Sequence, residues 1–88
     1  MIVRLHGPNI PREFREVRLD SWEGNIEDLI KFISDRNTIY KELLMEKESV
    51  RSDLNILING RHCMFINGLR TKIRTEDIVD ILLPVIGG

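Results

Sequence analysis

The chain has 88 residues, 42% of them hydrophobic, and its 13 basic side chains nearly balance its 14 acidic ones, which leaves a formal net charge of −1. This length supports one domain with a modest core and leaves little room for a deep catalytic cleft. The near-neutral charge excludes a strong overall field that would attract nucleic acid or an anionic membrane. We therefore expect a protein that binds or carries, and not one that catalyses a reaction by itself.

Cysteine use and the N-terminal segment favour a cytoplasmic location. Cys63 is the single cysteine, so an internal disulfide is excluded and a reducing compartment is favoured. The first six residues enter a strand-like alternation directly, without the apolar region of a signal peptide. No apolar run approaches the roughly 20 residues needed to span a bilayer.

The N-terminal part of the chain predicts a β-hairpin. Residues 1–6 alternate between apolar and polar side chains, as in a half-buried strand. Residues 7–11 interrupt this pattern with one glycine and two prolines, and residues 14–20 resume the alternation. We expect two strands joined by a long loop.

The next segment predicts the main helix. Asn25 can cap it, and Glu27 and Asp28 fall in its first turn, where the helix dipole favours negative charge. Its apolar side chains follow the helical i, i+3, i+4, i+7 stripe at Ile26, Leu29, Ile30 and Ile33. A weaker repeat of the period predicts a short second helix within residues 38–47, followed by a polar linker over residues 48–53.

Two Asn-Gly dipeptides organise the C-terminal part. Asn59-Gly60 favours the positive φ angles of a tight hairpin turn, so we expect it to join strands over residues 54–58 and 63–66, with Arg61 and His62 lengthening the loop. The second Asn-Gly pair, at residues 67–68, ends that strand, and a polar loop continues to Asp77. A last strand is expected over residues 78–83.

The order of these elements predicts an α+β architecture, with one main helix packed across one face of a mixed sheet. We expect the first and last strands to be central and parallel. The domain would comprise residues 1–83, because Pro84 cannot continue the hydrogen-bonded ladder. Residues 84–88 would form a flexible C-terminal tail that ends in Gly87-Gly88.

Several motifs in the last third of the chain point to one family. Asn59-Gly60, Gly68-Leu69 and Glu76-Asp77 occur in this order, and the chain continues to Pro84-Val85-Ile86-Gly87-Gly88. In these features it resembles the ubiquitin-like sulfur carriers. That group includes the small subunit of molybdopterin synthase, the thiamine-pathway sulfur carrier and the small archaeal modifiers, and its fold is the β-grasp.

The resemblance implies a function for the C-terminus. A separate activating enzyme would use ATP to adenylate the Gly88 carboxylate, while the chain itself would hold no permanent cofactor. The adenylate would become a thiocarboxylate that delivers sulfur to molybdopterin or another product, or would join a protein lysine through an isopeptide bond. Gly87, Ile86, Val85 and Pro84 would be recognised as the tail enters the enzyme, whose narrow site favours glycine because it lacks a Cβ.

The partners implied by the resemblance are the activating enzyme and either the molybdopterin synthase large subunit or target lysines. Strand parity also predicts a docking surface, because Leu57 and Leu82 should both point away from the helix-covered face. The alternative reading is that isolated surface leucines are ordinary. At the level of the whole chain, the alternative is a non-covalent β-grasp interaction module whose tail has no chemistry.

Other residues carry weaker signals. His62 and Cys63 lack the further ligands of a zinc site, so no metal is expected, and Cys63 should pack as a small apolar side chain. Trp22 is expected to close one end of the core. The basic side chains Arg61, Arg70, Lys72 and Arg74 can attract an acidic partner or RNA, although a solvated face is the simpler interpretation and no interleaved aromatics support base stacking.

Overall fold

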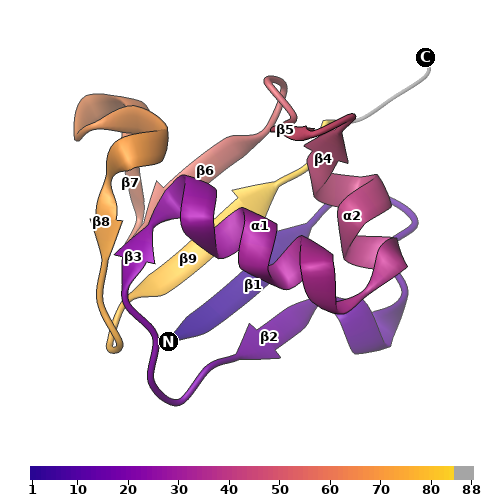
Figure 1. Ribbon diagram of the computed structural model, residues 1–88, viewed down its shortest axis with the longest axis horizontal. Helices are drawn as coiled ribbons and strands as arrows, with labels where there is room; N and C mark the ends of the chain where they lie inside the picture. Colours follow the sequence, from indigo (N-terminus) through magenta and orange to yellow (C-terminus); the bar gives the residue numbers. More distant parts are fainter. Residues whose placement is uncertain (85–88) are drawn as a thin grey trace.

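The computed structural model describes residues 1–84, and its main sheet has five strands in the order β2-β1-β9-β6-β7 (Figure 1). These strands are β1 (Ile2–His6), β2 (Glu16–Arg18), β6 (Asn55–Ile58), β7 (Arg61–His62) and β9 (Ile78–Leu82). β1 and β9 run parallel at the centre, and the other neighbouring pairs are antiparallel. The predictions of a mixed sheet and of a central parallel pair are confirmed.

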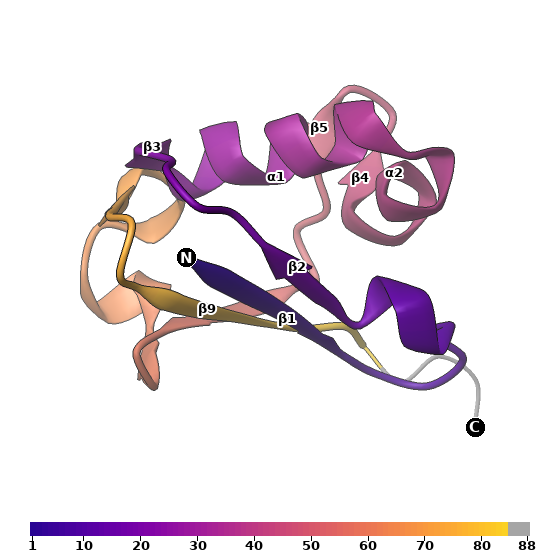
Figure 2. The ribbon, with the colours of Figure 1, turned by 90° about the horizontal axis from the view of Figure 1, so that it is seen from below.

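Helix α1 (Ile26–Arg36) covers one face of this sheet, and α2 (Thr38–Leu44) follows on the same side (Figure 2). Asn25 caps α1 as expected: its side chain accepts from the Asp28 N–H at 2.7 Å, and the Asp28 carboxylate accepts from the Asn25 N–H at 3.4 Å. This reciprocal capping box satisfies donors that the first turn would otherwise leave unpaired.

The core lies between α1 and the sheet. The predicted apolar stripe of the helix is fully buried, and so are the inward residues of the two central strands. The side chains with at most 1% exposure in these elements are Val3, Ile26, Leu29, Ile30, Ile33, Val79 and Ile81. The alternation and the helical period therefore identified the core faces of β1, β9 and α1 correctly.

Shorter elements complete the fold. Two small hairpins pair β3 (Gly24–Asn25) with β8 (Lys72–Ile73) and β4 (Met45–Glu46) with β5 (Ser49–Val50). Three 3₁₀ helices span Arg12–Phe14, Cys63–Phe65 and Gly68–Arg70. The segment expected to be a polar linker thus contains β5, and the loop expected before Asp77 contains β8.

The predicted strand over residues 63–66 is wrong. Asn59 and Gly60 have φ angles of 51° and 85°, so they form a two-residue turn that starts the partner strand at Arg61, opposite Ile58. This strand ends at His62, whose side chain accepts from the Met64 N–H at 3.1 Å and stabilises a 3₁₀ turn instead. Arg61 and His62 therefore belong to the sheet and do not lengthen the loop.

The last strand ends one residue earlier than expected, at Leu82, and the second strand is confined to residues 16–18. None of the helices within residues 1–84 is both long and apolar enough to cross a membrane. Pro84 is the last residue that the structure describes. The predicted tail residues Val85, Ile86, Gly87 and Gly88 lie outside the described part of the chain.

Candidate functional site

The end of β9 sets the point at which the chain leaves the sheet. The Leu83 N–H donates to the His6 carbonyl at 2.8 Å, which continues the β1–β9 ladder by one bond beyond the last strand residue. Pro84 follows and has no N–H to donate. The predicted recognition and modification residues therefore begin at Pro84, two residues after the end of the central strand β9.

The face of the sheet opposite α1 carries no helix among residues 1–84 (Figure 2). The two faces of β9 differ clearly in exposure, because Ile81 on the helix-covered face is 0% exposed whereas Leu82 on the open face is 37% exposed. Leu57 on β6 lies opposite Asp80 and is half-buried, and Asn55 lies opposite Leu82. Leu57 and Leu82 are therefore diagonal neighbours on this open face, as parity predicted, and their role in docking remains a prediction.

A charged cluster lies beside these leucines, and the sequence analysis missed it. Arg4 donates from Nε and Nη2 to the two carboxylate oxygens of Asp80, at 2.8 and 3.1 Å. His6 Nε2 lies 2.7 Å from Asp80 Oδ1. The Arg4 hydrogen bond is the main cause that holds the pKa of the Asp80 carboxyl below its ordinary value of 3.8, against the opposing effect of burial.

The register explains how this cluster and the leucines form one surface. Arg4 on β1 lies opposite Asp80, Asp80 lies opposite Leu57, and Leu57 lies opposite His62 on β7. Residues that face each other across neighbouring strands project to the same side of a sheet. The open face thus combines a fixed ion pair with apolar and imidazole side chains. The only sequence signal for the ion pair was that Arg4, His6 and Asp80 fall on the outward-facing positions of their strands.

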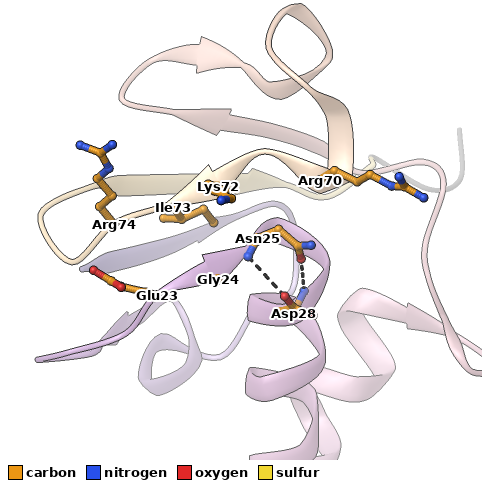
Figure 3. Close-up of a pocket in the computed structure, with 8 residues that line it drawn as sticks. All are labelled: Glu23, Gly24, Asn25, Asp28, Arg70, Lys72, Ile73 and Arg74. Atoms are coloured by element: carbon orange, nitrogen blue, oxygen red, sulfur yellow. Dashed lines mark hydrogen bonds between the residues drawn. The ribbon is translucent and has the colours of Figure 1, made fainter.

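A shallow cleft of about 470 Å³ lies at the other end of the molecule, beside the start of α1 (Figure 3). It is lined by Glu23, Gly24, Asn25, Asp28, Arg70, Lys72, Ile73 and Arg74. Arg70 and Arg74 point apart in Figure 3, and the helix N-terminus is already capped by Asn25 and Asp28. The cleft therefore lacks the converging donors expected of an anion site.

The remaining predicted residues have structural positions. Cys63 is 4% exposed, and its burial raises the pKa of its thiol above the ordinary value of 9.0, which disfavours the nucleophilic thiolate. Trp22 packs against the core, and a Cβ on Gly24 would lie 2.7 Å from its ring. Within residues 1–84, no three His, Cys, Asp or Glu side chains gather as a metal site.

Comparison with protein families decides what this arrangement represents. Residues 8–88, from the first loop through Gly87-Gly88, match the ThiS family. The chain belongs to the ThiS family. Its members are small ubiquitin-like sulfur carriers and modifiers, and the family works with E1-like activating enzymes. The predicted resemblance and the predicted β-grasp fold are confirmed.

Solved structures show the same fold as this ThiS-family chain. The small archaeal modifier protein 1 from Methanosarcina acetivorans is 27% identical, with a TM-score of 0.75, and the alignment covers 99% of this chain and 94% of that one. A chain from the Amycolatopsis orientalis BexX/CysO complex is 23% identical, with a TM-score of 0.70 and coverage of 98% and 99%. Sulfolobus solfataricus Urm1 is 24% identical, with a TM-score of 0.61 and coverage of 96% and 100%. No curated protein sequence matches the chain.

Proposed function

We propose that this ThiS-family chain is a sulfur carrier whose Gly88 carboxylate is activated by a separate E1-like enzyme. The observation that carries the proposal is the family match, which extends through the Gly87-Gly88 pair. The central position of β9 supports it, because the last strand delivers the following residues from a fixed point beside β1. The chain itself acts as a co-substrate and not as an enzyme.

The chemistry requires activation because a carboxylate is a poor electrophile. The Gly88 carboxylate attacks the α-phosphate of ATP on the enzyme, which forms an acyl-adenylate and releases pyrophosphate. Hydrosulfide then attacks the acyl carbon, the acyl–oxygen bond breaks, and AMP departs as the leaving group. The product is a Gly88 thiocarboxylate. Glycine at positions 87 and 88 suits a narrow enzyme channel, since it has no Cβ and adopts φ angles barred to other residues.

The thiocarboxylate then donates its sulfur to a second molecule. The proposed products are molybdopterin, with a molybdopterin synthase large subunit as the partner, or another sulfur-containing compound. The same acyl-adenylate can instead react with a lysine amine of a target protein and form an isopeptide bond. Both routes use one activated Gly88, so they share the first step.

The open face is the proposed docking surface for the activating enzyme. Leu82 precedes the tail by only a few residues, and Leu57 lies diagonally beside it. An enzyme that captures Gly88 must cover the surface around the end of β9, and exposed apolar side chains there gain from being covered. Pro84, Val85 and Ile86 would be recognised together with the glycines.

The test is the intact mass of the protein after incubation with ATP, the host's E1-like enzyme and sulfide. We expect a mass gain equal to the replacement of one oxygen by sulfur, located at Gly88 by fragmentation. A matched control is the same chain with one alanine added after Gly88, which should show no gain. If the unmodified chain also stays unchanged while the enzyme thiolates another carrier, the non-covalent interaction module becomes the better description.

A further inference from the structure

The loop between β7 and β8 exposes an unusual group of apolar side chains. Met64 is 73% exposed, Phe65 76%, Ile66 46% and Leu69 37%. We call these four residues the apolar knob. Single exposed hydrophobic residues are ordinary on protein surfaces, but a contiguous apolar patch typically marks an interaction site. Met64, Phe65 and Leu69 lie on two 3₁₀ helices that contact each other, and Ile66 directly follows the first of them, so the four form one such patch.

The knob is held in place by its backbone. The Ile66 N–H donates to the Cys63 carbonyl at 2.9 Å, and the Asn67 N–H donates to Thr71 Oγ1 at 3.0 Å. Its two ends are anchored in the interior, because Cys63 is 4% exposed and Thr71 is 5% exposed. A preorganised loop loses little conformational freedom on binding, so its exposed side chains are suited to docking.

The knob continues the open face of the sheet. The rings of Phe65 and His62 meet edge to face, with their centroids 6.2 Å apart. His62 lies directly opposite Leu57, which belongs to the proposed docking face with Leu82. A partner that covers Leu57 therefore reaches Phe65 through His62, without crossing an intervening charged pair.

The charge around the knob indicates the chemistry of its partner. Residues 54–75 contain four basic side chains and no acidic one, although the whole chain has a net charge of −1. Arg61 contacts the knob, because its guanidinium donates to the Phe65 carbonyl at 3.4 Å, and Arg70 directly follows Leu69 in the chain. Phenylalanine, methionine and arginine are enriched at the centres of protein interfaces, which favours a protein partner with an acidic rim.

We propose that the apolar knob inserts into an apolar socket, rimmed by carboxylates, on the E1-like enzyme that activates Gly88. This inference rests on the proposed function and extends its docking surface from Leu57 and Leu82 to the far end of the sheet. An anionic bilayer is a poorer occupant, because stable membrane attachment requires a second anchoring signal and a denser basic cluster. The knob adds affinity, and the tail supplies the reacting group.

The experiment measures binding and activation separately. Calorimetry gives the Kd of the host's E1-like enzyme for the wild-type chain and for the double variant Met64→Ser, Phe65→Ser. ATP–pyrophosphate exchange then gives kcat and KM for the same proteins. The matched control is Phe32→Ser, because Phe32 is an exposed aromatic, 39% accessible, on the helix-covered side. Circular dichroism and thermal unfolding check that each variant is folded.

We expect the double variant to raise Kd and KM about tenfold or more, with kcat retained, and the control to keep wild-type values. An unchanged Kd in the folded double variant would overturn the proposal, and so would undetectable binding of the wild-type chain. If wild-type binding depends on the knob but no exchange occurs, the docking surface stands and the proposed activation of Gly88 fails.

Two further readouts test other occupants. Sedimentation velocity compares the wild-type chain with the double variant, and a wild-type dimer that the variant loses would assign the knob to a second copy. Co-flotation with phosphatidylserine vesicles that depends on Met64 and Phe65 would assign it to a membrane surface. Either result, together with an unchanged enzyme Kd, overturns the proposed partner.

Discussion

The backbone N–H of Leu83 donates a 2.8 Å hydrogen bond to the carbonyl of His6, one residue beyond the end of β9. Because β1 and β9 are parallel neighbours at the centre of the sheet, this bond fixes the direction in which the chain leaves the domain. The point at which the chain leaves the sheet, just before Pro84, therefore depends on residues near the start of the chain.

Substitution of Gly7 should disturb this exit. An added Cβ at Gly7 would lie 3.0 Å from the Cβ of Leu83, closer than ordinary van der Waals contact, so Leu83 must shift by a few tenths of an ångström. We expect Gly7→Ala to cost about 1 kcal/mol of unfolding free energy and to speed hydrogen exchange at the Leu83 amide. Two-dimensional NMR measures this exchange, and unchanged protection of Leu83 would contradict the prediction.

Substitutions on the two opposite faces of β9 should affect docking and folding separately. Leu82→Asp places a charge on the open face, so we expect its affinity for the E1-like enzyme to fall about tenfold or more while the thermal midpoint changes little. Ile81→Asp is the matched control, because Ile81 is 0% exposed and a carboxylate there lacks solvent. We expect the circular dichroism spectrum of this control to be that of an unfolded chain. Unfolding of Leu82→Asp instead would refute the assignment of faces.

Local patterns were sufficient to predict most of the framework. The capping residue Asn25 and the buried stripe of α1 follow from helical spacing and capping chemistry alone. The central parallel pair followed from the order of the elements. Such features depend on residues that are close in sequence, or on the order of the elements, from which the fold class can be argued.

Two features that depend on contacts of particular side chains with distant parts of the chain were not predicted. The apolar run over residues 63–66 was interpreted as a strand, but it forms a 3₁₀ turn in which only Cys63 is buried, and composition does not show which apolar side chains lack a neighbour. Similarly, the Arg4–Asp80 pair joins residues 76 positions apart, and its partners are determined by the exact register of two parallel strands. A stricter use of the two-residue turn rule at Asn59-Gly60 would have placed β7 correctly.

The Asp80 cluster should make stability depend on pH. The pKa of Asp80 is depressed in the folded state, so its contribution is fully present above the ordinary value of 3.8 and is lost as pH falls through the folded-state pKa. We expect Asp80→Asn to be less stable than the wild type at pH 7, with a difference that shrinks below about pH 4. Urea unfolding at both pH values measures this, with Asp20→Asn as an exposed control. A difference that stays constant with pH would contradict the linkage.

The Asn59-Gly60 turn offers a final test that separates backbone strain from side-chain bonding. Asn59 has a φ of 51°, and its side chain accepts from the Ile78 N–H at 2.9 Å and donates to Asp77 Oδ1 at 3.0 Å. Asn59→Gly keeps the positive φ accessible but removes both bonds, so we expect a loss of about 1 kcal/mol. Asn59→Ala also forces a side chain into the left-handed region and should cost about 1 kcal/mol more. Urea unfolding of the two variants measures the difference. Equal losses of unfolding free energy would show that the left-handed backbone at position 59 adds no cost for alanine relative to glycine.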